Sequence, residues 1–282
     1  MVERDRFGAL VAHLILLLGV LIIAFPVYVA LIGSTHDAAT IANGEMGFLP
    51  GSHGLENYSR VLFEGARSTT REPVSTMLMN SLIMALAITF GKIAISLLSA
   101  YAIVYFRFPF RMIGFWVIFV TLMLPVEVRI YPTYKVVADL NLLDSYVGLT
   151  LPLIASATAT LLFRQFFMTV PDELVEASKI DGAGPIKFFF DTLLPLSRTN
   201  IAALFVILFI YGWNQYLWPI LITTRDDMQT IVIGIKKMIA VVDALTEWQL
   251  VMATAVLAML PPVAVVILMQ RLFVKGLTET EK

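Results

Sequence analysis

The sequence predicts an all-α integral membrane protein with six transmembrane helices, and two observations support this fold class. Of the 282 residues, 59% are hydrophobic and only 15% are charged, against roughly a quarter in an ordinary soluble domain. The charged residues are also unevenly spread, because long windows contain almost none. A bilayer core about 30 Å thick needs about 20 apolar residues of helix, and most of these windows meet or approach that length.

Lys92 is the single charged residue in six windows, which are 7–36, 73–106, 112–126, 145–163, 199–224 and 248–270. Charged side chains are costly at membrane depth, which explains their absence. The windows predict helices over about 9–33, 77–106, 112–130, 145–165, 200–222 and 248–272. We expect these helices to form a single transmembrane domain over residues 1–282, surrounded by lipid.

The first and third windows need separate justification. Arg4 and Arg6 precede the first, as in a signal peptide, but its apolar run is much longer than an h-region of about 7–15 residues. We therefore expect a retained helix. The third window is short, so its helix is expected to continue past Pro125, with Glu127 and Arg129 facing protein or water.

The distribution of Lys and Arg predicts the orientation. With the N-terminus in the cytoplasm, the inner segments carry Lys and Arg at roughly twice the density of the outer ones. The short inner loop Arg107–Arg111 is the clearest local case. We therefore expect both termini to be cytoplasmic.

Composition and motifs also exclude several functions. There is no cysteine, so disulfides and thiolate metal sites are excluded, and a net charge of −1 offers no basic field for nucleic acid. Gly91-Lys92 lacks the other residues of a phosphate-binding P-loop, so ATP chemistry would come from another subunit. An ion-coupled secondary transporter stays as a less favoured alternative, because it would need more ionisable groups inside the membrane than Lys92 alone. An intramembrane enzyme would need clustered His, Asp or Glu there, and none is seen.

The inner loop 164–198 carries the most informative pattern. Pro171 suits a first helical turn, and Asp172 and Glu173 complement the helix dipole. Gly182 is able to end this helix in a left-handed conformation, and a second short helix can run from Pro185 to Pro195. The loop is expected to form a helix–turn–helix that a partner can approach closely. The alternative is an amphipathic helix lying on lipid.

Residues 176–183 of this loop read EASKIDGA, and Leu194-Pro195 follow. The pattern resembles the EAA motif of ABC importer permeases, with Ser178 and Thr192 as its two departures. The resemblance implies the type I ABC importer permease fold, in which segment 171–195 docks on an ATPase subunit. The ATPase-coupling residues that it implies are Glu176, Ala177, Asp181, Gly182, Ala183, Leu194 and Pro195. The alternative for Glu176 is a solvated pair with Lys179.

Other segments resemble carbohydrate-type permeases and, more narrowly, the permeases of sn-glycerol-3-phosphate importers. They read LMLPVEVRIYPT, LDSYVGLTLPL, SATATLLFRQFFMTVPDELVEA and FIYGWNQYLWP. The resemblance implies a bacterial inner-membrane protein that imports this substrate, with glycerophosphodiesters or another sugar or polyol as alternatives. The implied partners are a second permease, two ATPase subunits that bind ATP and Mg, and a periplasmic binding protein. No cofactor is expected in this chain.

Six polar residues are candidates for the translocation pathway. Lys92 lies 15 residues before Arg107, which is about 22 Å along a helix, so its ammonium should face the bundle interior or water. It could attract a phosphate, or it could serve helix packing. Glu127 and Arg129 could line an outer gate or bridge each other. Asn214, Gln215 and Tyr216 are polar groups on an otherwise apolar fifth helix.

Overall fold

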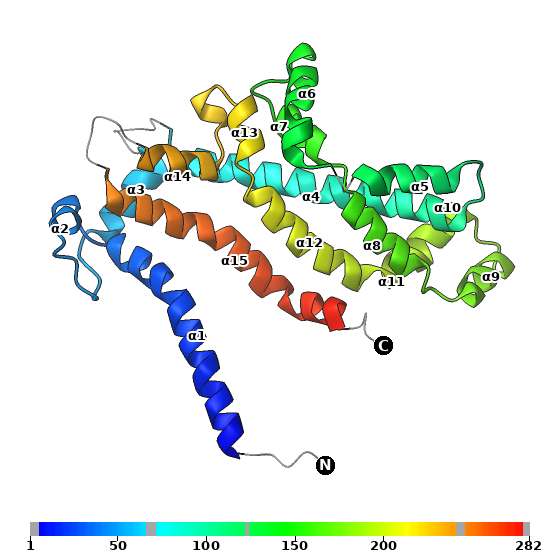
Figure 1. Ribbon diagram of the computed structural model, residues 1–282, viewed down its shortest axis with the longest axis horizontal. Helices are drawn as coiled ribbons and strands as arrows, with labels where there is room; N and C mark the ends of the chain where they lie inside the picture. The colour runs from blue at the N-terminus through cyan, green and yellow to red at the C-terminus, as the bar shows by residue number, and fades with distance from the viewer. Residues whose placement is uncertain (1–5, 66–71, 122–123, 241–245, 279–282) are drawn as a thin grey trace. The chain divides into compact units, whose positions relative to one another are not determined.

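The computed structural model describes residues 6–65, 72–121, 124–240 and 246–278, and the regular structure within these ranges is helical (Figure 1). The chain divides into two compact units, and the single transmembrane domain expected over 1–282 stays a prediction. Unit 1 comprises Met1–Met77 and Ile233–Leu260, and unit 2 comprises Leu78–Val232 and Pro261–Lys282.

Unit 1 is built around a long apolar helix. Its helices are α1 (Arg6–Gly33), α2 (Ala38–Ala42), α3 (Gly54–Phe63), most of α14 (Ile231–Ile239) and the first part of α15 (Trp248–Thr278). Most side chains of α1 are exposed and apolar, as expected for a surface that lipid or another subunit covers.

Buried polar contacts hold the C-terminal end of α1 in unit 1. The side-chain amide of Asn57, in α3, donates hydrogen bonds to the carbonyl oxygens of Ser34 at 2.9 Å and His36 at 2.8 Å. A Cβ added to Gly33 would lie 2.1 Å from the Met252 sulfur, so glycine permits α1 to approach α15 closely here.

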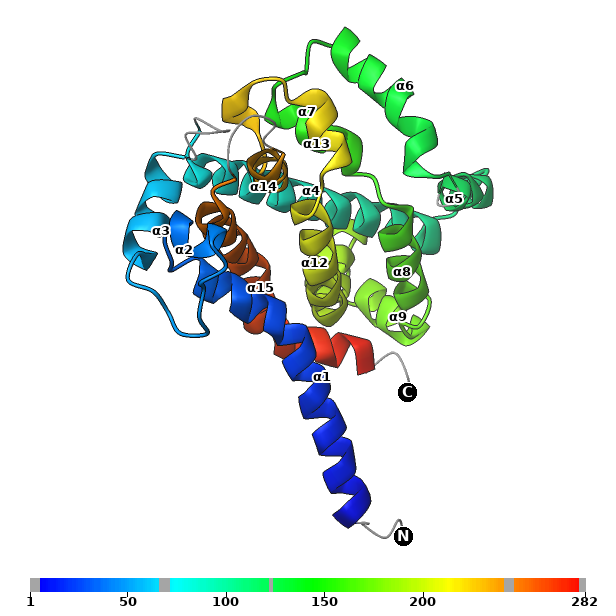
Figure 2. The same cartoon turned by 60° about the vertical axis from the view of Figure 1, so that its left-hand side comes forward.

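Unit 2 contains most of α4 and the helices that pack along it. They are α4 (Val74–Tyr105), α5 (Arg111–Val120), α6 (Val126–Asp139), α7 (Tyr146–Thr150), η2 (Leu151–Leu153), α8 (Ala157–Phe167), α9 (Asp172–Ile180), α10 (Pro185–Phe188), η3 (Phe189–Leu193), α11 (Leu194–Leu196), α12 (Arg198–Trp213), α13 (Leu217–Ile222) and η4 (Asp226–Met228), with the last part of α15. Figure 1 shows α9 and α10 near the C-terminal end of α4, and Figure 2 shows α9 directly below α8.

Two hydrophobic clusters organise unit 2. One joins α4 to α8, α10 and α12 and contains the buried rings of Tyr101, Phe163 and Phe188. The other joins α4 to α6, α7 and α13 through residues such as Met84 and Trp218. The first cluster packs on the C-terminal half of α4 and the second on its middle, at Met84 and Ile88, so α4 is the spine of the unit.

Three helices in the described part of the chain are long and apolar enough to cross a membrane, and two bent helix pairs raise the number to five if each pair is one span. The three are Phe7–Gly33, Val74–Tyr105 and Trp248–Arg271. The bent pairs are Tyr146–Leu153 with Ala157–Phe167 (48°) and Pro185–Leu196 with Arg198–Trp213 (71°). The count of six spans therefore stays a prediction.

The region expected as a third helix, 112–130, differs most from expectation. It consists of α5, which is only 10 residues long, and α6, which begins after Pro125. Pro125 lies outside α6 at its N-terminal end, with an extended ψ of 146°. Proline lacks the N–H that a continuous helix would require there, which accounts for a boundary at this position.

Candidate functional site

Segment 171–195, which we call the coupling segment, presents its first helix to solvent. Pro171 precedes α9, and the acidic residues Asp172 and Glu173 occupy the first turn, where the positive end of the helix dipole favours them. No residue of α9 is buried, and the apolar side chain of Ile180 is 86% exposed. Leu174, in α9, and Ile186, in α10, are exposed as well, so the segment presents several apolar side chains at its surface.

The turn after α9 depends on Gly182, which has a φ of +74°. The N–H of Ala183 donates to the carbonyl of Ser178 at 2.9 Å, and the N–H of Gly182 donates to the carbonyl of Lys179 at 3.0 Å. These two bonds are those of a Schellman motif, which places a left-handed residue directly after the helix. The predicted role of Gly182 in ending this helix therefore agrees with the structure.

The second half of the segment bends into the bundle. The chain from Phe189 to Leu193 forms a π-helical turn directly before Leu194 and Pro195. Pro195 cannot donate a backbone hydrogen bond, and its ring would clash with the carbonyl four residues earlier, so a regular α-helix is not possible through this point. The wider turn accommodates the proline, and α12 continues at an angle of 71°.

A buried aromatic cluster anchors the segment to α4. The hydroxyl of Tyr101 donates to the carbonyl oxygen of Pro185 at 2.8 Å, and its ring centroid lies 5.0 Å from that of Phe189. The rings of Tyr105 and Phe188 are 5.4 Å apart in an edge-to-face arrangement. Such pairs add about 0.5–1.5 kcal/mol beyond area burial. The exposed α9 is thus tied to a rigid support at its C-terminal side.

The carboxylates of the coupling segment remain available for a partner. Glu176 and Asp181 are exposed, and the structure, which describes both Glu176 and Lys179, shows no ion pair between these two residues. Ala177 is exposed and Ala183 is half-buried, so small residues flank the charged ones. The arrangement suits close docking with hydrogen bonds or cations from another protein.

Lys92 is the buried cation of unit 2. Its side chain is 7% exposed, and its Nζ lies 3.9 Å from the ring centroid of Tyr211, in α12. A cation over an aromatic face is attracted by the ring quadrupole, more so when it is desolvated. Among the described residues, no carboxylate forms an ion pair with Lys92. The positive charge of Arg129, in α6, also acts on it.

The remaining pathway candidates lie elsewhere in unit 2. Asn214, Gln215 and Tyr216 occupy the break between α12 and α13 instead of the middle of one fifth helix. Gln215 donates from its side-chain amide to the carbonyl oxygen of Tyr211 at 3.1 Å, so this break is next to the partner of Lys92. The side chain of Glu127 lies outside the described residues.

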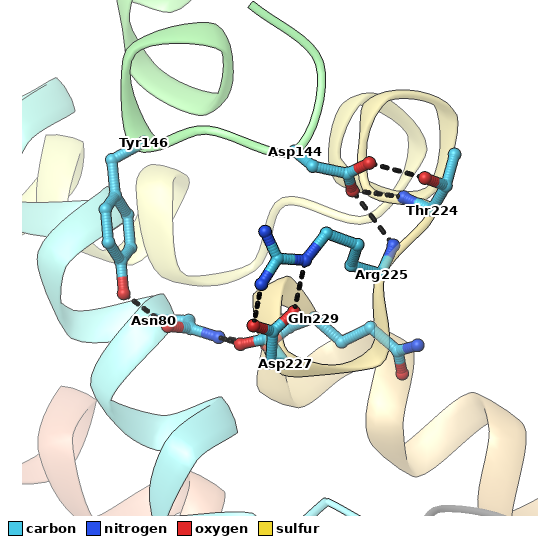
Figure 3. Close-up of polar contacts among 7 residues, drawn as sticks. All are labelled: Asn80, Asp144, Tyr146, Thr224, Arg225, Asp227 and Gln229. Atoms are coloured by element: carbon cyan, nitrogen blue, oxygen red, sulfur yellow. Dashed lines mark hydrogen bonds and ion pairs between the residues drawn. The ribbon is translucent and has the colours of Figure 1, made fainter.

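A second polar site, which the sequence did not indicate, lies near the N-terminal end of α4 (Figure 3). Asn80 is 2% exposed, and its amide donates to the carbonyl oxygens of Asp227 at 2.8 Å and Gln229 at 2.9 Å. Its side-chain oxygen accepts a hydrogen bond of 2.6 Å from the Tyr146 hydroxyl. One buried amide therefore joins three separate segments of unit 2.

At the same site, the carboxylate of Asp144 is hydrogen-bonded to the loop at Thr224 and Arg225. Asp144 accepts hydrogen bonds from the backbone N–H groups of Thr224 at 2.6 Å and Arg225 at 2.9 Å, and from the Thr224 hydroxyl. Burial raises the pKa of the Asp144 carboxyl, but these hydrogen bonds together with the charge of Arg225 outweigh burial and hold the pKa below its ordinary value. Arg225 in turn pairs with Asp227. We call these residues, with Asn80, Tyr146 and Gln229, the clasp.

Comparison with known proteins agrees with this architecture. Residues 92–279 match the family described as binding-protein-dependent transport system inner membrane component. The sn-glycerol-3-phosphate transport system permease proteins UgpE of Agrobacterium fabrum and Rhizobium meliloti are 60% and 58% identical to this chain over 282 residues, which is 100% of each protein.

A solved structure shows the same fold. The crystal structure of a bacterial ABC transporter involved in the import of the acidic polysaccharide alginate contains a chain that matches this one with a TM-score of 0.82. The match covers 96% of this chain and 98% of that chain at 20% sequence identity. It confirms the predicted all-α permease fold. The protein therefore belongs to the family of inner-membrane components of binding-protein-dependent transport systems.

Proposed function

We propose that this chain is one of two permease subunits of an ATP-driven importer that carries sn-glycerol-3-phosphate into the cytoplasm. The single observation that carries the substrate is the 57–60% identity, over the full chain, to permeases named for that compound. The other partners are two ATPase subunits, which hold ATP and Mg, and a periplasmic binding protein. The chain lies in the bacterial inner membrane with both termini in the cytoplasm.

In this proposal the coupling segment transmits the work of the ATPase. Glu176 accepts hydrogen bonds or a cation from a groove on the ATPase, and Gly182 maintains the turn that follows. Closure of the ATPase pair moves the segment, and the bundle changes between inward-facing and outward-facing states. Differential contacts in the two states supply the free energy of this change. The exposure of α9 and its anchorage through Tyr101 support this role.

The cations of unit 2 would attract the phosphate of the substrate. Lys92 is buried against Tyr211, and Arg129 repels it electrostatically. A dianionic phosphate between two cations would relieve this repulsion, and an ammonium inside a membrane is a candidate for a substrate path. Gln215, bonded next to Tyr211, adds an uncharged polar group at the same place.

The coupling role is tested by Glu176→Lys in the complete transporter in proteoliposomes. We expect binding-protein-stimulated ATP hydrolysis and uptake to fall together, because the charge reversal opposes docking. Glu56→Lys, an equal charge change at an exposed position of α3, is the matched control and should leave both rates unchanged. Wild-type hydrolysis and uptake with Glu176→Lys would refute the coupling role.

The substrate path is tested by Lys92→Met and Lys92→Arg. Uptake of sn-glycerol-3-phosphate should fall strongly in the first variant and partly recover in the second, because only the second keeps the charge. ATP hydrolysis without binding protein serves as a reference for intact assembly. Unimpaired uptake by Lys92→Met would remove Lys92 from the pathway.

A further inference from the structure

A pocket of about 340 Å³ lies in unit 2, beside the start of α12. Its walls are apolar apart from a single cation, Arg198. The apolar walls include Phe190, Leu194, Ile201, Phe205 and Met269. Small-molecule pockets in proteins typically measure about 300–1,000 Å³ and combine apolar walls with a few polar groups, so this pocket has the size and composition of a ligand site.

The wall of the pocket is fixed by packing. The ring of Phe205 lies with its centroid 5.5 Å from that of Phe90 and stacks on Phe209 at 6.1 Å. Ala202, which also lines the pocket, is buried at 5% exposure. The apolar side is therefore preformed and would not need to reorganise around a ligand.

The cation of the pocket is free to bind an anion. Arg198 is exposed, and among the residues that the structure describes it has no ion pair with a carboxylate. It is the first residue of α12, a helix of 16 residues, where the helix dipole also favours negative charge. A guanidinium binds a phosphate through two parallel hydrogen bonds.

The sequence places this pocket at the boundary between membrane and water. The charge-free run 199–224 begins directly after Arg198, and the charge-free run 248–270, which includes Met269, ends directly before Arg271. Two membrane-compatible runs therefore end at the same pocket. A ligand here would have its charged group at the level of the lipid head groups and its apolar part among the acyl chains.

We propose that this pocket binds one anionic glycerophospholipid, with its phosphate on Arg198 and an acyl chain against Ile201, Phe205 and Met269. Basic pockets between transmembrane helices are known to hold such head groups. Because Leu194 also lines the pocket, the bound lipid would touch the end of the coupling segment. The proposal does not depend on which substrate the transporter carries.

The test is native mass spectrometry of the complete transporter, released from detergent after titration with phosphatidylglycerol. We expect one tightly held lipid in the wild type. Arg198→Gln should bind it about tenfold more weakly, because the variant loses one charge-assisted contact. Arg198→Lys should retain most of the binding. Ala202→Leu keeps the charge but fills the apolar part, so it should also weaken binding.

Two comparisons separate this site from its alternatives. Arg107→Gln removes an exposed cation outside the pocket and should bind as wild type does, which controls for general attraction to anionic lipid. Phosphatidylcholine with the same acyl chains should bind weakly. Equal binding by Arg198→Gln and wild type, absence of a held lipid, or displacement by sn-glycerol-3-phosphate without acyl chains would each overturn the proposal.

Discussion

The coupling segment and the clasp lie at opposite ends of α4. The polar groups of the clasp are hydrogen-bonded within the chain, whereas those of the coupling segment are exposed. Asn80 and Tyr101 mark the two ends and are separated by about 30 Å of helix. In the clasp, the side chains of Asn80 and Asp144 form hydrogen bonds with other residues of the same chain. In the coupling segment, Glu176 remains exposed to solvent.

The clasp is complete within this chain, whereas the coupling segment is, in our proposal, completed by an ATPase subunit. Buried polar groups are costly unless they are paired, so the clasp contributes to the stability of the chain itself. The exposed carboxylates of α9 contribute little to the stability of the chain, and they are free to form hydrogen bonds or ion pairs with a partner. Substitutions at the clasp should therefore reduce stability, whereas those in the coupling segment should reduce coupling.

The largest effect is expected for Asn80→Ala. It removes three hydrogen bonds and leaves the carbonyls of Asp227 and Gln229 without this donor, which should lower the free energy of unfolding by about 2–4 kcal/mol. Thermal unfolding of the purified protein measures the change. Tyr146→Phe removes only one of the three bonds and should cost about 1 kcal/mol. Equal stability of the two variants would contradict a central role for Asn80.

A smaller, local effect is expected for Gly182→Ala. Nothing lies within 4 Å of the added Cβ, so the cost comes from the positive φ and should be about 1 kcal/mol. Amide hydrogen exchange at Ala183 should become severalfold faster, since its N–H closes the turn. Gly184→Ala is the matched control, because Gly184 has a φ of −73° and equally open surroundings. Similar exchange in both variants would show that the turn does not depend on this backbone conformation.

Tyr101→Phe should have a smaller effect still, about 0.5–1 kcal/mol. Like Asn80, Tyr101 donates to a backbone carbonyl, but Pro185 is exposed and water can replace the lost donor. Thermal unfolding of Tyr101→Phe beside Asn80→Ala compares the same kind of bond at the two ends. A decrease in stability as large as that of Asn80→Ala would show that the coupling segment contributes as much to the stability of the chain as the clasp does.

The smallest effect concerns pH at the clasp. Because the pKa of Asp144 lies below its ordinary value of 3.8 in the folded protein, the contribution of this carboxylate to stability is present above pH 3.8 and is lost as the pH falls through the folded pKa. Asp144→Asn removes the charge and tolerates the positive φ of 51°. The difference in melting temperature between wild type and this variant should shrink as the pH falls from 5 towards 3. A constant difference would assign the stabilisation to something other than the charge.

Features set by composition or local geometry could be predicted from the sequence. Three of the charge-poor windows correspond to α1, α4 and α15 because exclusion of charge from a bilayer acts along a single helix. The turn at Gly182 was predictable because a left-handed helix end favours glycine wherever it occurs. Both inferences need only neighbouring residues.

Features that depend on distant segments could not be predicted. The clasp joins Asn80 to residues 227–229 and Asp144 to Thr224, and no spacing in the sequence indicates these pairings. The break at Asn214–Tyr216 also escaped prediction, because the residues around it are apolar enough for a continuous helix. The separation of α5 from α6 was not predicted either, because the third helix was expected to continue past Pro125.

The 71° corner between the coupling segment and α12 has a mechanical consequence. A force along the axis of the short helices of this segment acts at 71° to the axis of α12 and therefore exerts a torque at the corner after Pro195. The rigid packing of Tyr101 and Phe189 limits slippage at this corner. In the proposed complex, small displacements at the ATPase would appear as tilting of α12, whose Tyr211 lies against Lys92.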